Sequence, residues 1–249
     1  LPVYVAMEEG IFSKNGIDVD LKFAGNDDQV FAAVVGGSAD FGIGDPAFVA
    51  VAKERKGPGK VVALLVSKLG LSGYTNKNID PVTDVKMLNG LRVSSFPQPS
   101  TTYTLLFEMK RGPAPKMFVV PVAFGAEMAA LAGKQVDIAV SLEPTASQAE
   151  DKGYKIVFDV EKFTDPQAIT GLTTTEDVIA KKPETVQKVV TSLTEAMILL
   201  RDSPDVAHRT AKKLFPNLKE SVVTAAIDRI LAKKIYPENV VIKDEYWQR

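Results

Sequence analysis

The spacing of hydrophobic residues switches repeatedly between a helical period and a strand period along this chain. Val3, Met7 and Ile11 recur at helical spacing, which predicts a helix over 2–12. Residues 17–23 then carry an apolar side chain at every second position, which predicts a strand with one buried face. Because such short helices and strands continue to alternate up to residue 174, the pattern predicts an α/β fold.

The remaining elements follow from the same reasoning. Strands are predicted at 39–44, 61–67, 91–95, 118–122, 138–141, 154–159 and 167–174, with helices between them. After residue 174 the pattern changes to long amphipathic helices at 182–202, 205–215 and 218–234. The chain therefore reads as an α/β body followed by a helical C-terminal part.

Composition places the chain among ordinary globular proteins. Hydrophobic residues make up 45% of its 249 residues, charged residues make up 24%, and the formal net charge is −1. The 30 basic and 31 acidic residues balance without a long Lys/Arg cluster, so nucleic acid is not expected as a partner. No run of 18 apolar residues occurs, so no membrane-spanning helix is predicted.

Several kinds of chemistry are excluded by residues that the chain lacks. It has no cysteine, which rules out disulfides, thiolate nucleophiles and zinc ribbons, and which mildly favours an exported protein. The single histidine, His208, lies among basic residues on a late helix, where a solvated face explains it. Gly42 and Gly44 lack the third glycine of a dinucleotide-binding loop. We therefore expect no catalytic residues, no metal and no cofactor.

The order of elements predicts two α/β lobes. The chain is expected to cross between them near 71–81 and 163–171, which gives a discontinuous first lobe, 1–77 with 171–249, and a second lobe, 78–170. Two crossings of this kind are typical of proteins whose lobes close on a ligand about a hinge. The predicted ligand cleft lies between the lobes.

Candidate binding residues in the first lobe follow from where loops meet the sheet. In open α/β sheets, ligands bind outside the carboxyl ends of the strands. Asp45, before Pro46, reads both as a helix cap and as a ligand contact, and the same holds for Asn26 and Asp27. Tyr4 and Phe48 are candidate aromatic contacts beside them.

The loop 94–102 is the strongest ligand loop in the sequence. Two prolines stiffen it, and hydroxyl side chains concentrate before a helix, where they cap the helix or bind a ligand. Its candidate contacts are Phe96, Gln98, Ser100, Thr101 and Thr102.

Three further residues complete the predicted site. Glu143 precedes Pro144 at the end of a strand, so it either complements the dipole of the following helix or accepts hydrogen bonds in the pocket. Tyr74 and Gly171 lie at the two predicted crossings.

Several segments together resemble the solute-binding proteins of importers for nitrate, sulfonate, taurine and thiamine precursors. They are LPVYVAMEEGIFSKNGIDVDL, GGSADFGIGDPAFVA, TDVKMLNGLRV with PQPSTTYTLL, VDIAVSLEPTASQAEDKGY and KKPETVQKVVTSLTEA. The resemblance implies a two-lobe periplasmic-binding-protein fold of type 2, and a monomer that delivers a small molecule to a membrane ABC permease. It also implies a periplasmic or cell-surface location and a strand before Leu1. Because the sequence does not begin with Met, we expect that a signal peptide, a tag or a disordered start precedes it.

The sequence leaves the solute and two rival functions open. The candidate loops carry Asp27, Asp28, Asp45 and Glu143 against Lys68 alone, so an oxyanion would depend on helix starts and hydroxyl groups. The alternative is a neutral or amine-bearing solute. Aromatic rings would stack against it, and Glu143 would accept hydrogen bonds from its N–H groups. The rivals are an enzyme on the same fold, with Asp45 or Glu143 as its acid or base, and a ligand-sensing domain of a larger receptor.

Overall fold

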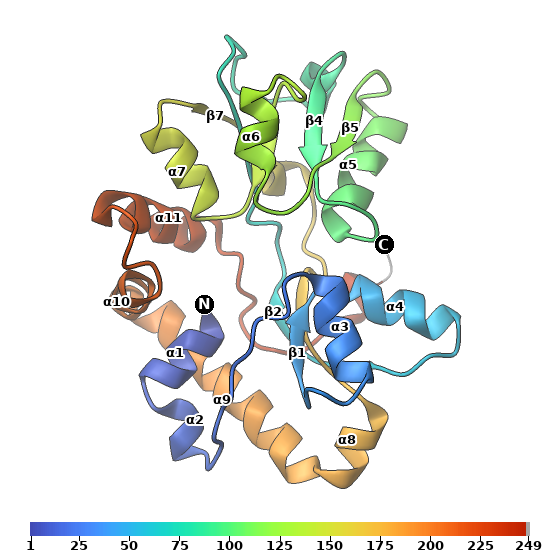
Figure 1. Ribbon diagram of the computed structural model, residues 1–249, viewed down its shortest axis with the longest axis vertical. Coiled ribbons are helices and arrows are strands. Elements are labelled where there is room, and N and C mark those ends of the chain that lie inside the picture. Colours follow the sequence, from blue (N-terminus) through green and yellow to red (C-terminus); the bar gives the residue numbers. More distant parts are fainter. Residues whose placement is uncertain (248–249) are drawn as a thin grey trace. The chain divides into compact units, whose positions relative to one another are not determined.

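The computed structural model describes residues 1–247, and the chain folds into two compact units (Figure 1). Unit 1 comprises Leu1–Lys68, Pro166–Asn217 and the residues from Lys234 onward, and unit 2 comprises Leu69–Asp165 with Leu218–Lys233. Each unit combines helices with a sheet of its own, so the predicted α/β class is confirmed.

Unit 1 is built on a three-stranded sheet in the order β1-β8-β2. Its strands are β1 (Gly42–Gly44), β2 (Lys60–Val66) and β8 (Thr170–Thr174). Because β8 runs antiparallel to both neighbours, β1 and β2 are parallel and end at the same edge.

Helices surround this sheet in unit 1. They are α1 (Pro2–Glu8), α2 (Ile11–Lys14), α3 (Asp27–Val35), α4 (Ala47–Glu54), α8 (Glu176–Lys181), α9 (Pro183–Asp202) and α10 (Pro204–Leu214), with a 3₁₀ turn, η3 (Asp244–Tyr246). The apolar stripe of α9 is buried as its spacing predicts, with Leu193 and Leu200 each only 1% exposed. It packs against α1, α2 and α10 and forms the helical core of unit 1.

The predicted strand over 17–23 is wrong. The segment has no regular secondary structure and joins no sheet among residues 1–247. Ile17 and Val19 are only partly buried, and Phe23 is 83% exposed. A strand needs a neighbour for its backbone hydrogen bonds, and alternation alone does not supply one.

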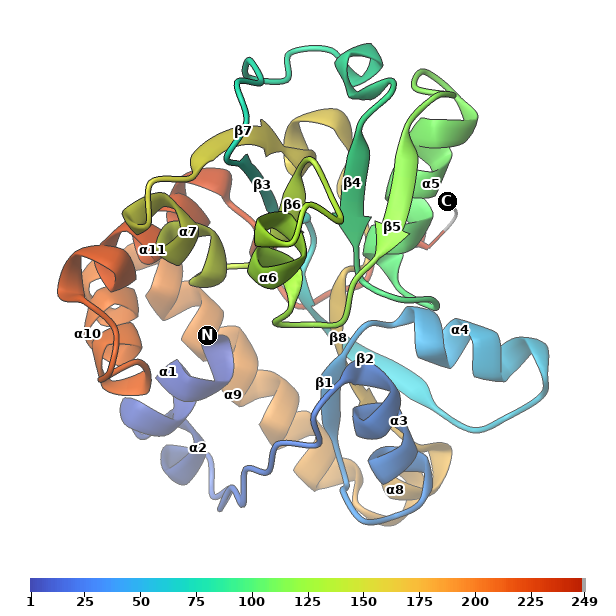
Figure 2. The same ribbon diagram turned by 45° about the horizontal axis from the view of Figure 1, so that its top comes forward.

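Unit 2 holds five strands, β3 (Ser72–Thr75), β4 (Arg92–Ser95), β5 (Phe118–Pro121), β6 (Ala139–Ser141) and β7 (Lys155–Asp159). They form one sheet in the order β6-β3-β7 and a parallel pair, β4-β5. A parallel bridge between Val93 and Ile138 joins the two, supported by the Ser94 hydroxyl, which accepts the Val140 N–H at 2.7 Å. Figure 2 shows β4 and β5 side by side, with α5 close to them.

The helices of unit 2 follow its strands. They are α5 (Thr101–Arg111), α6 (Glu127–Ala132), α7 (Thr145–Asp151) and α11 (Glu220–Lys233), with 3₁₀ turns at η1 (Val85–Leu88) and η2 (Val160–Phe163). A core of Tyr74, Val122, Leu131, Val136 and Ala149 lies between α6, α7 and the sheet.

The observed division differs from the predicted one by the placement of β3, which the predicted ranges put in the first lobe, and of α11. The predicted ranges put residues 218–234 with the first lobe, whereas α11 packs against α7 in unit 2. Lys233 explains this placement, because its ammonium donates to the Leu71 carbonyl oxygen at 3.2 Å and to the Ser72 hydroxyl at 2.9 Å. A helix far along the sequence is thus tied to the first strand of unit 2.

No helix within residues 1–247 combines the length and the apolar character that crossing a membrane requires.

Candidate functional site

The parallel strands of unit 1 bring several predicted residues to one edge of its sheet. Asp45 directly follows β1, Lys68 follows β2 by two residues, and Gly171 of β8 is paired with Gly44. A Cβ built on Gly171 would lie 2.5 Å from Val61 Cγ1, so this position has no room for a side chain. Gly171 therefore keeps the backbones at this edge close together.

Two carboxylates, Asp27 and Asp45, lie next to each other at this edge. Asp27 Oδ1 accepts the Asp45 N–H at 3.1 Å, and Asp45 Oδ1 accepts the Ala47 N–H at 2.9 Å at the start of α4. Burial of the carboxyl raises the pKa of Asp27; the Asp45 N–H lowers it and the Asp45 charge raises it further, with a net rise. The two carboxylates therefore lie at close range, and the Asp45 charge disfavours the charged form of Asp27.

The other predicted residues of unit 1 surround this pair to different degrees. Asn26 caps α3, since its Oδ1 accepts the Gln29 N–H at 2.9 Å. Phe48 lies on the first turn of α4, and its ring is 6.4 Å from that of Phe31. Tyr4 lies on α1, where burial raises its pKa, and not on the loops at this edge.

The hydroxyl-rich loop of unit 2 is used mainly to start α5. The Ser100 hydroxyl oxygen accepts the Tyr103 N–H at 3.1 Å, which makes Ser100 the helix cap. Thr101 is half-buried on the first turn, Thr102 is only 6% exposed, and Gln98 is exposed. Capping therefore accounts for Ser100, and the loop keeps Gln98 and Thr101 accessible.

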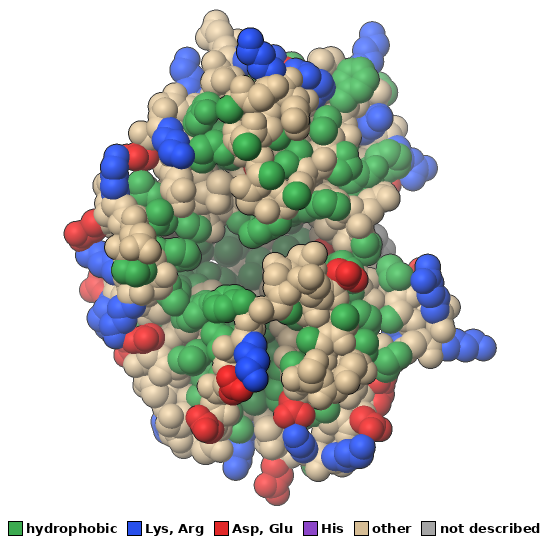
Figure 3. Space-filling model, in the orientation of Figure 1, with side chains coloured by type: hydrophobic (Ala, Val, Ile, Leu, Met, Phe, Trp, Pro, Cys, Tyr) green, Lys and Arg blue, Asp and Glu red, His purple; other side chains and the backbone are tan. Residues whose placement is uncertain are grey.

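An aromatic pair stands at the carboxyl ends of β4 and β5. Phe96 follows β4 and Phe124 follows β5, and their ring centroids are 5.2 Å apart at an interplanar angle of 45°. Phe124 is 67% exposed. Around α6 and these strand ends, Figure 3 shows mostly hydrophobic and uncharged side chains, while Lys and Arg gather toward the ends where the strands begin. Phe124 is thus an exposed ring beside the half-buried Phe96, and the sequence analysis did not single it out.

Unit 2 also holds a buried phenol. Tyr74 is fully buried, and its hydroxyl is 3.0 Å from the Ser141 hydroxyl. Burial raises the pKa of Tyr74 to about 12; the Ser141 hydrogen bond opposes this, and the nearby carboxylate of Glu127 adds to it. The ring of Tyr74 belongs to the core and presents no face to a solute.

Glu143 is held by α11. Its side chain is 2% exposed, Oε1 accepts from Arg229 at 2.6 Å, and Oε2 accepts the Ser147 N–H at 3.0 Å. Arg229 also donates to Glu150 at 2.7 Å. Both oxygens of Glu143 are thus occupied by the protein, which supports its helix-capping interpretation more than its pocket-acceptor one.

The other cations near this edge of unit 2 are also paired. Lys233 lies 2.8 Å from Asp159 and 3.1 Å from Glu161, and Lys162 lies 2.9 Å from Asp159. Burial raises the pKa of Asp159, but its hydrogen bonds from Lys233 and Lys162 outweigh that effect and lower it overall. A solute anion would therefore have to compete with carboxylates for each of these cations.

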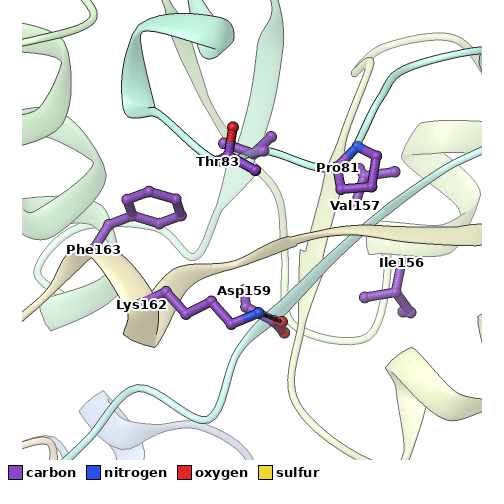
Figure 4. A pocket seen from close by; sticks show the side chains of 8 residues that line it. Pro81, Thr83, Ile156, Val157, Asp159, Lys162 and Phe163 are labelled. Carbon is purple, nitrogen blue, oxygen red and sulfur yellow. Dashed lines mark ion pairs between the residues drawn. The ribbon is translucent and has the colours of Figure 1, made fainter.

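A cavity of about 380 Å³ opens along β7, between η2 and the segment before η1 (Figure 4). Its lining is Pro81, Val82, Thr83, Ile156, Val157, Asp159, Lys162 and Phe163. Asp159 and Lys162 both line the cavity and form an ion pair with each other. The charged side chains of the lining are therefore already paired. Within the described residues, no group of three or more His, Asp or Glu side chains is placed to hold a metal ion.

Solved structures share this fold at low sequence identity. The periplasmic aliphatic sulphonate binding protein SsuA from Escherichia coli aligns at a TM-score of 0.76 and 17% identity, over 98% of this chain and 84% of that one. A Candida albicans protein described as having the generic periplasmic binding protein structural fold aligns at 0.66 and 14%, over 98% and 94%. The desulfurization enzyme DSZB aligns at 0.61 and 16%, over 98% and 92%. The chain thus has the predicted periplasmic-binding-protein fold.

No curated protein matches the sequence. The family model described as NMT1/THI5 like matches residues 1–207. The matched range includes Asp45 and the loop 94–102. The chain belongs to the NMT1/THI5-like family.

Proposed function

We propose that this protein is the solute-binding receptor of an ABC importer. The observation that carries the proposal is the family match over residues 1–207, on a chain with two α/β units of the periplasmic-binding-protein fold. Each unit gathers polar or aromatic side chains at the carboxyl edge of its strands, where α/β proteins bind ligands. The receptor is exported, acts as a monomer, and passes its solute to a membrane permease.

The rival function is that of an enzyme, because one protein of similar structure is the desulfurization enzyme. The groups that such an enzyme would use are Asp27, whose pKa is raised, and Asp45 beside it. Binding without turnover is favoured here, because the chain has no cysteine and one histidine, which lies on the distant α10. The predicted cleft between the lobes remains a prediction.

The test is to identify what the purified protein binds and what becomes of it. Solute released from the natively purified protein is identified by mass spectrometry and added back during thermal unfolding. At about 100 times its Kd, a ligand adds roughly 2.7 kcal/mol to the free energy of unfolding, a Tm rise of about 5 °C or more. A solute recovered unchanged supports a receptor, a new product supports an enzyme, and the absence of both a bound solute and any Tm shift across a broad panel would overturn the proposal.

A further inference from the structure

Several cations gather at the end of unit 2 where β4, β5 and β7 begin. Asn89 links two of them, because its amide donates to the Lys86 carbonyl oxygen at 2.9 Å and its Oδ1 accepts the Lys116 N–H at 2.8 Å. Arg92, the first residue of β4, donates to the Lys134 carbonyl oxygen at 2.8 Å. We call this group the basic end, and its members are Lys77, Lys86, Arg92, Lys116, Lys134 and Lys155.

A buried carboxylate, Asp137, ties three segments of the basic end together. Its oxygens accept from Arg92 Nε at 3.0 Å and from Arg92 Nη2 at 2.9 Å, and it also pairs with Lys77. These hydrogen bonds, chiefly that from Arg92, hold the pKa of Asp137 well below its usual range. Two cations share this one negative charge, so the cluster keeps a net positive charge.

The other cations of the basic end are lysines without a partner in the protein. Within residues 1–247, four exposed ammonium groups form no ion pair and no hydrogen bond, and they belong to Lys86, Lys116, Lys134 and Lys155. The exposed acids of the neighbouring segment are Asp80 and Asp84. Positive charge is therefore in excess, and Figure 3 shows Lys and Arg side chains gathered at this end of unit 2.

A hollow of about 250 Å³ lies at the basic end, where β3 ends beside the start of β7. It is lined by Thr75, Asn76, Lys77, Asn78, Gly153 and Lys155. A Cβ on Gly153 would meet no atom within 4 Å, so the turn before β7 does not fill the hollow. Within the described residues, the side-chain amides of Asn76 and Asn78 form no hydrogen bond with the protein. Amide donors beside an ammonium group suit a phosphate oxygen.

Exposed apolar side chains stand among these lysines. Phe118, the first residue of β5, is paired with Arg92 and is 55% exposed, and Met87 of η1 is 40% exposed. Basic residues with exposed apolar neighbours are typical of surfaces that lie on an anionic bilayer, where the apolar groups enter the headgroup layer. Lysine is depleted at protein–protein interfaces, which favour arginine as their cation. The four unpaired lysines therefore favour a lipid surface over an acidic protein.

We propose that the basic end of unit 2 binds the surface of an anionic phospholipid membrane, with a phosphate headgroup in the hollow and Phe118 in the headgroup layer. The inference goes beyond the proposed receptor function, because it concerns a surface of unit 2 and not the solute. It fits that function, since the permease of an importer lies in a membrane.

Vesicles of two compositions test the inference. The full chain is sedimented with phosphatidylcholine vesicles that contain about 30% phosphatidylglycerol, which supplies the negative charge, and with pure phosphatidylcholine vesicles. We expect binding to the anionic vesicles alone. It should weaken by about tenfold or more as the salt concentration rises from about 0.01 M to about 0.15 M, because the Debye length falls from about 30 Å to about 8 Å.

Variants then assign the contacts. Lys86→Gln combined with Lys116→Gln should weaken vesicle binding about 25-fold, since each lysine near the membrane surface contributes about fivefold. Phe118→Ala should weaken it about fivefold at unchanged charge, because half of a ring is lost from the headgroup layer. The matched control combines Lys56→Gln and Lys60→Gln, two exposed lysines of unit 1 that have no side-chain partner among the described residues. It should change binding less than about twofold.

Three results contradict the inference. They are equal binding to neutral and anionic vesicles, equal losses in the test pair and the control pair, and no vesicle binding at low salt. Retention on a polyglutamate peptide or a DNA duplex without vesicle binding would assign the basic end to an acidic protein or to a nucleic acid instead. Solute binding by the same variants should equal that of the wild type, so the receptor function is judged separately.

Discussion

The two units treat the carboxylates near their strand ends in opposite ways. In unit 1, Asp27 and Asp45 stand side by side and are held by backbone N–H groups. In unit 2, Glu143 and Asp159 are held by the side chains of Arg229 and Lys233, both from α11. Backbone N–H groups thus bind the two carboxylates of unit 1, whereas ion pairs with a late helix balance the two carboxylates of unit 2.

The difference follows from how each carboxylate is supported. Backbone N–H groups carry no net charge, so these hydrogen bonds hold the Asp27 and Asp45 carboxylates without offsetting their charge. Glu143 is almost fully buried, where an unpaired charge would be strongly unfavourable, so it requires Arg229. Glu127 is the exception in unit 2, because its second oxygen has neither kind of support.

The largest effect is expected from removing the cation that neutralises unit 2. Arg229→Met leaves Glu143, whose side chain is 2% exposed, without its cation. It should lower the free energy of unfolding by about 3–5 kcal/mol, which is measured by urea denaturation. Arg201→Met is the control, since its partner Asp202 is exposed, and it should cost less than about 1 kcal/mol. Equal effects in the two variants would show that Glu143 does not depend on Arg229.

A smaller effect is expected from crowding the edge of unit 1. In Gly171→Ala the new Cβ would lie 2.5 Å from Val61 Cγ1, and the strand pairing would shift at a cost of about 1–3 kcal/mol. The paired variant Val61→Ala opens that space. We expect the double variant to recover part of the loss relative to the sum of the single variants, measured as a coupling free energy. Strict additivity would contradict the contact.

Sequence patterns predicted the parts of the fold that depend on local spacing. The stripe on α9 was confirmed because one helix face suffices to bury it, and the strands at 61–67 and 118–122 carry their own apolar signal. Residues 17–23 failed because alternation does not say whether a partner strand is present. Strand β3 was missed because Ser72 and Gly73 lack strand propensity and are paired by their neighbours instead.

The candidate site shows the same limit. Asn26 and Ser100 were recognised from capping patterns, which are local in sequence. The Arg229–Glu143 pair joins residues 86 positions apart, so no local pattern could assign it. Phe124 could have been noticed as the aromatic residue that follows a strand before a glycine. Glu127 reads as an ordinary first-turn acid until its burial is known.

A modest effect is expected at the buried hydroxyl pair of unit 2. Tyr74→Phe removes the phenol that is 3.0 Å from the Ser141 hydroxyl and should cost about 1 kcal/mol, the net value of a buried hydrogen bond. Tyr103→Phe on α5 is the control and should change the free energy of unfolding by a few tenths of a kcal/mol at most, roughly the scatter for surface changes. If both variants match the wild type, the Tyr74–Ser141 bond contributes nothing to stability.

The smallest effect separates the two edges by the sign of their pH dependence. The folded pKa of Asp27 lies above its ordinary value of 3.8, so the folded state binds more protons there, and stability falls as the pH rises through that window. Asp159 has a folded pKa below 3.8, so its contribution is present above that value and is lost as the pH falls through its folded pKa.

Both pH dependences are tested by measuring the free energy of unfolding over this acidic range. The proteins compared are the wild type, Asp27→Asn and Asp159→Asn. Relative to the wild type, Asp27→Asn should gain stability as the pH rises, by less than about 1 kcal/mol because the site is partly solvated. Asp159→Asn should lose relative stability over the same rise, since Lys233 then lacks a charged partner. Parallel curves for Asp27→Asn and the wild type would mean that Asp45 and burial do not disfavour the Asp27 charge, and the contrast between the two edges would then rest on unit 2 alone.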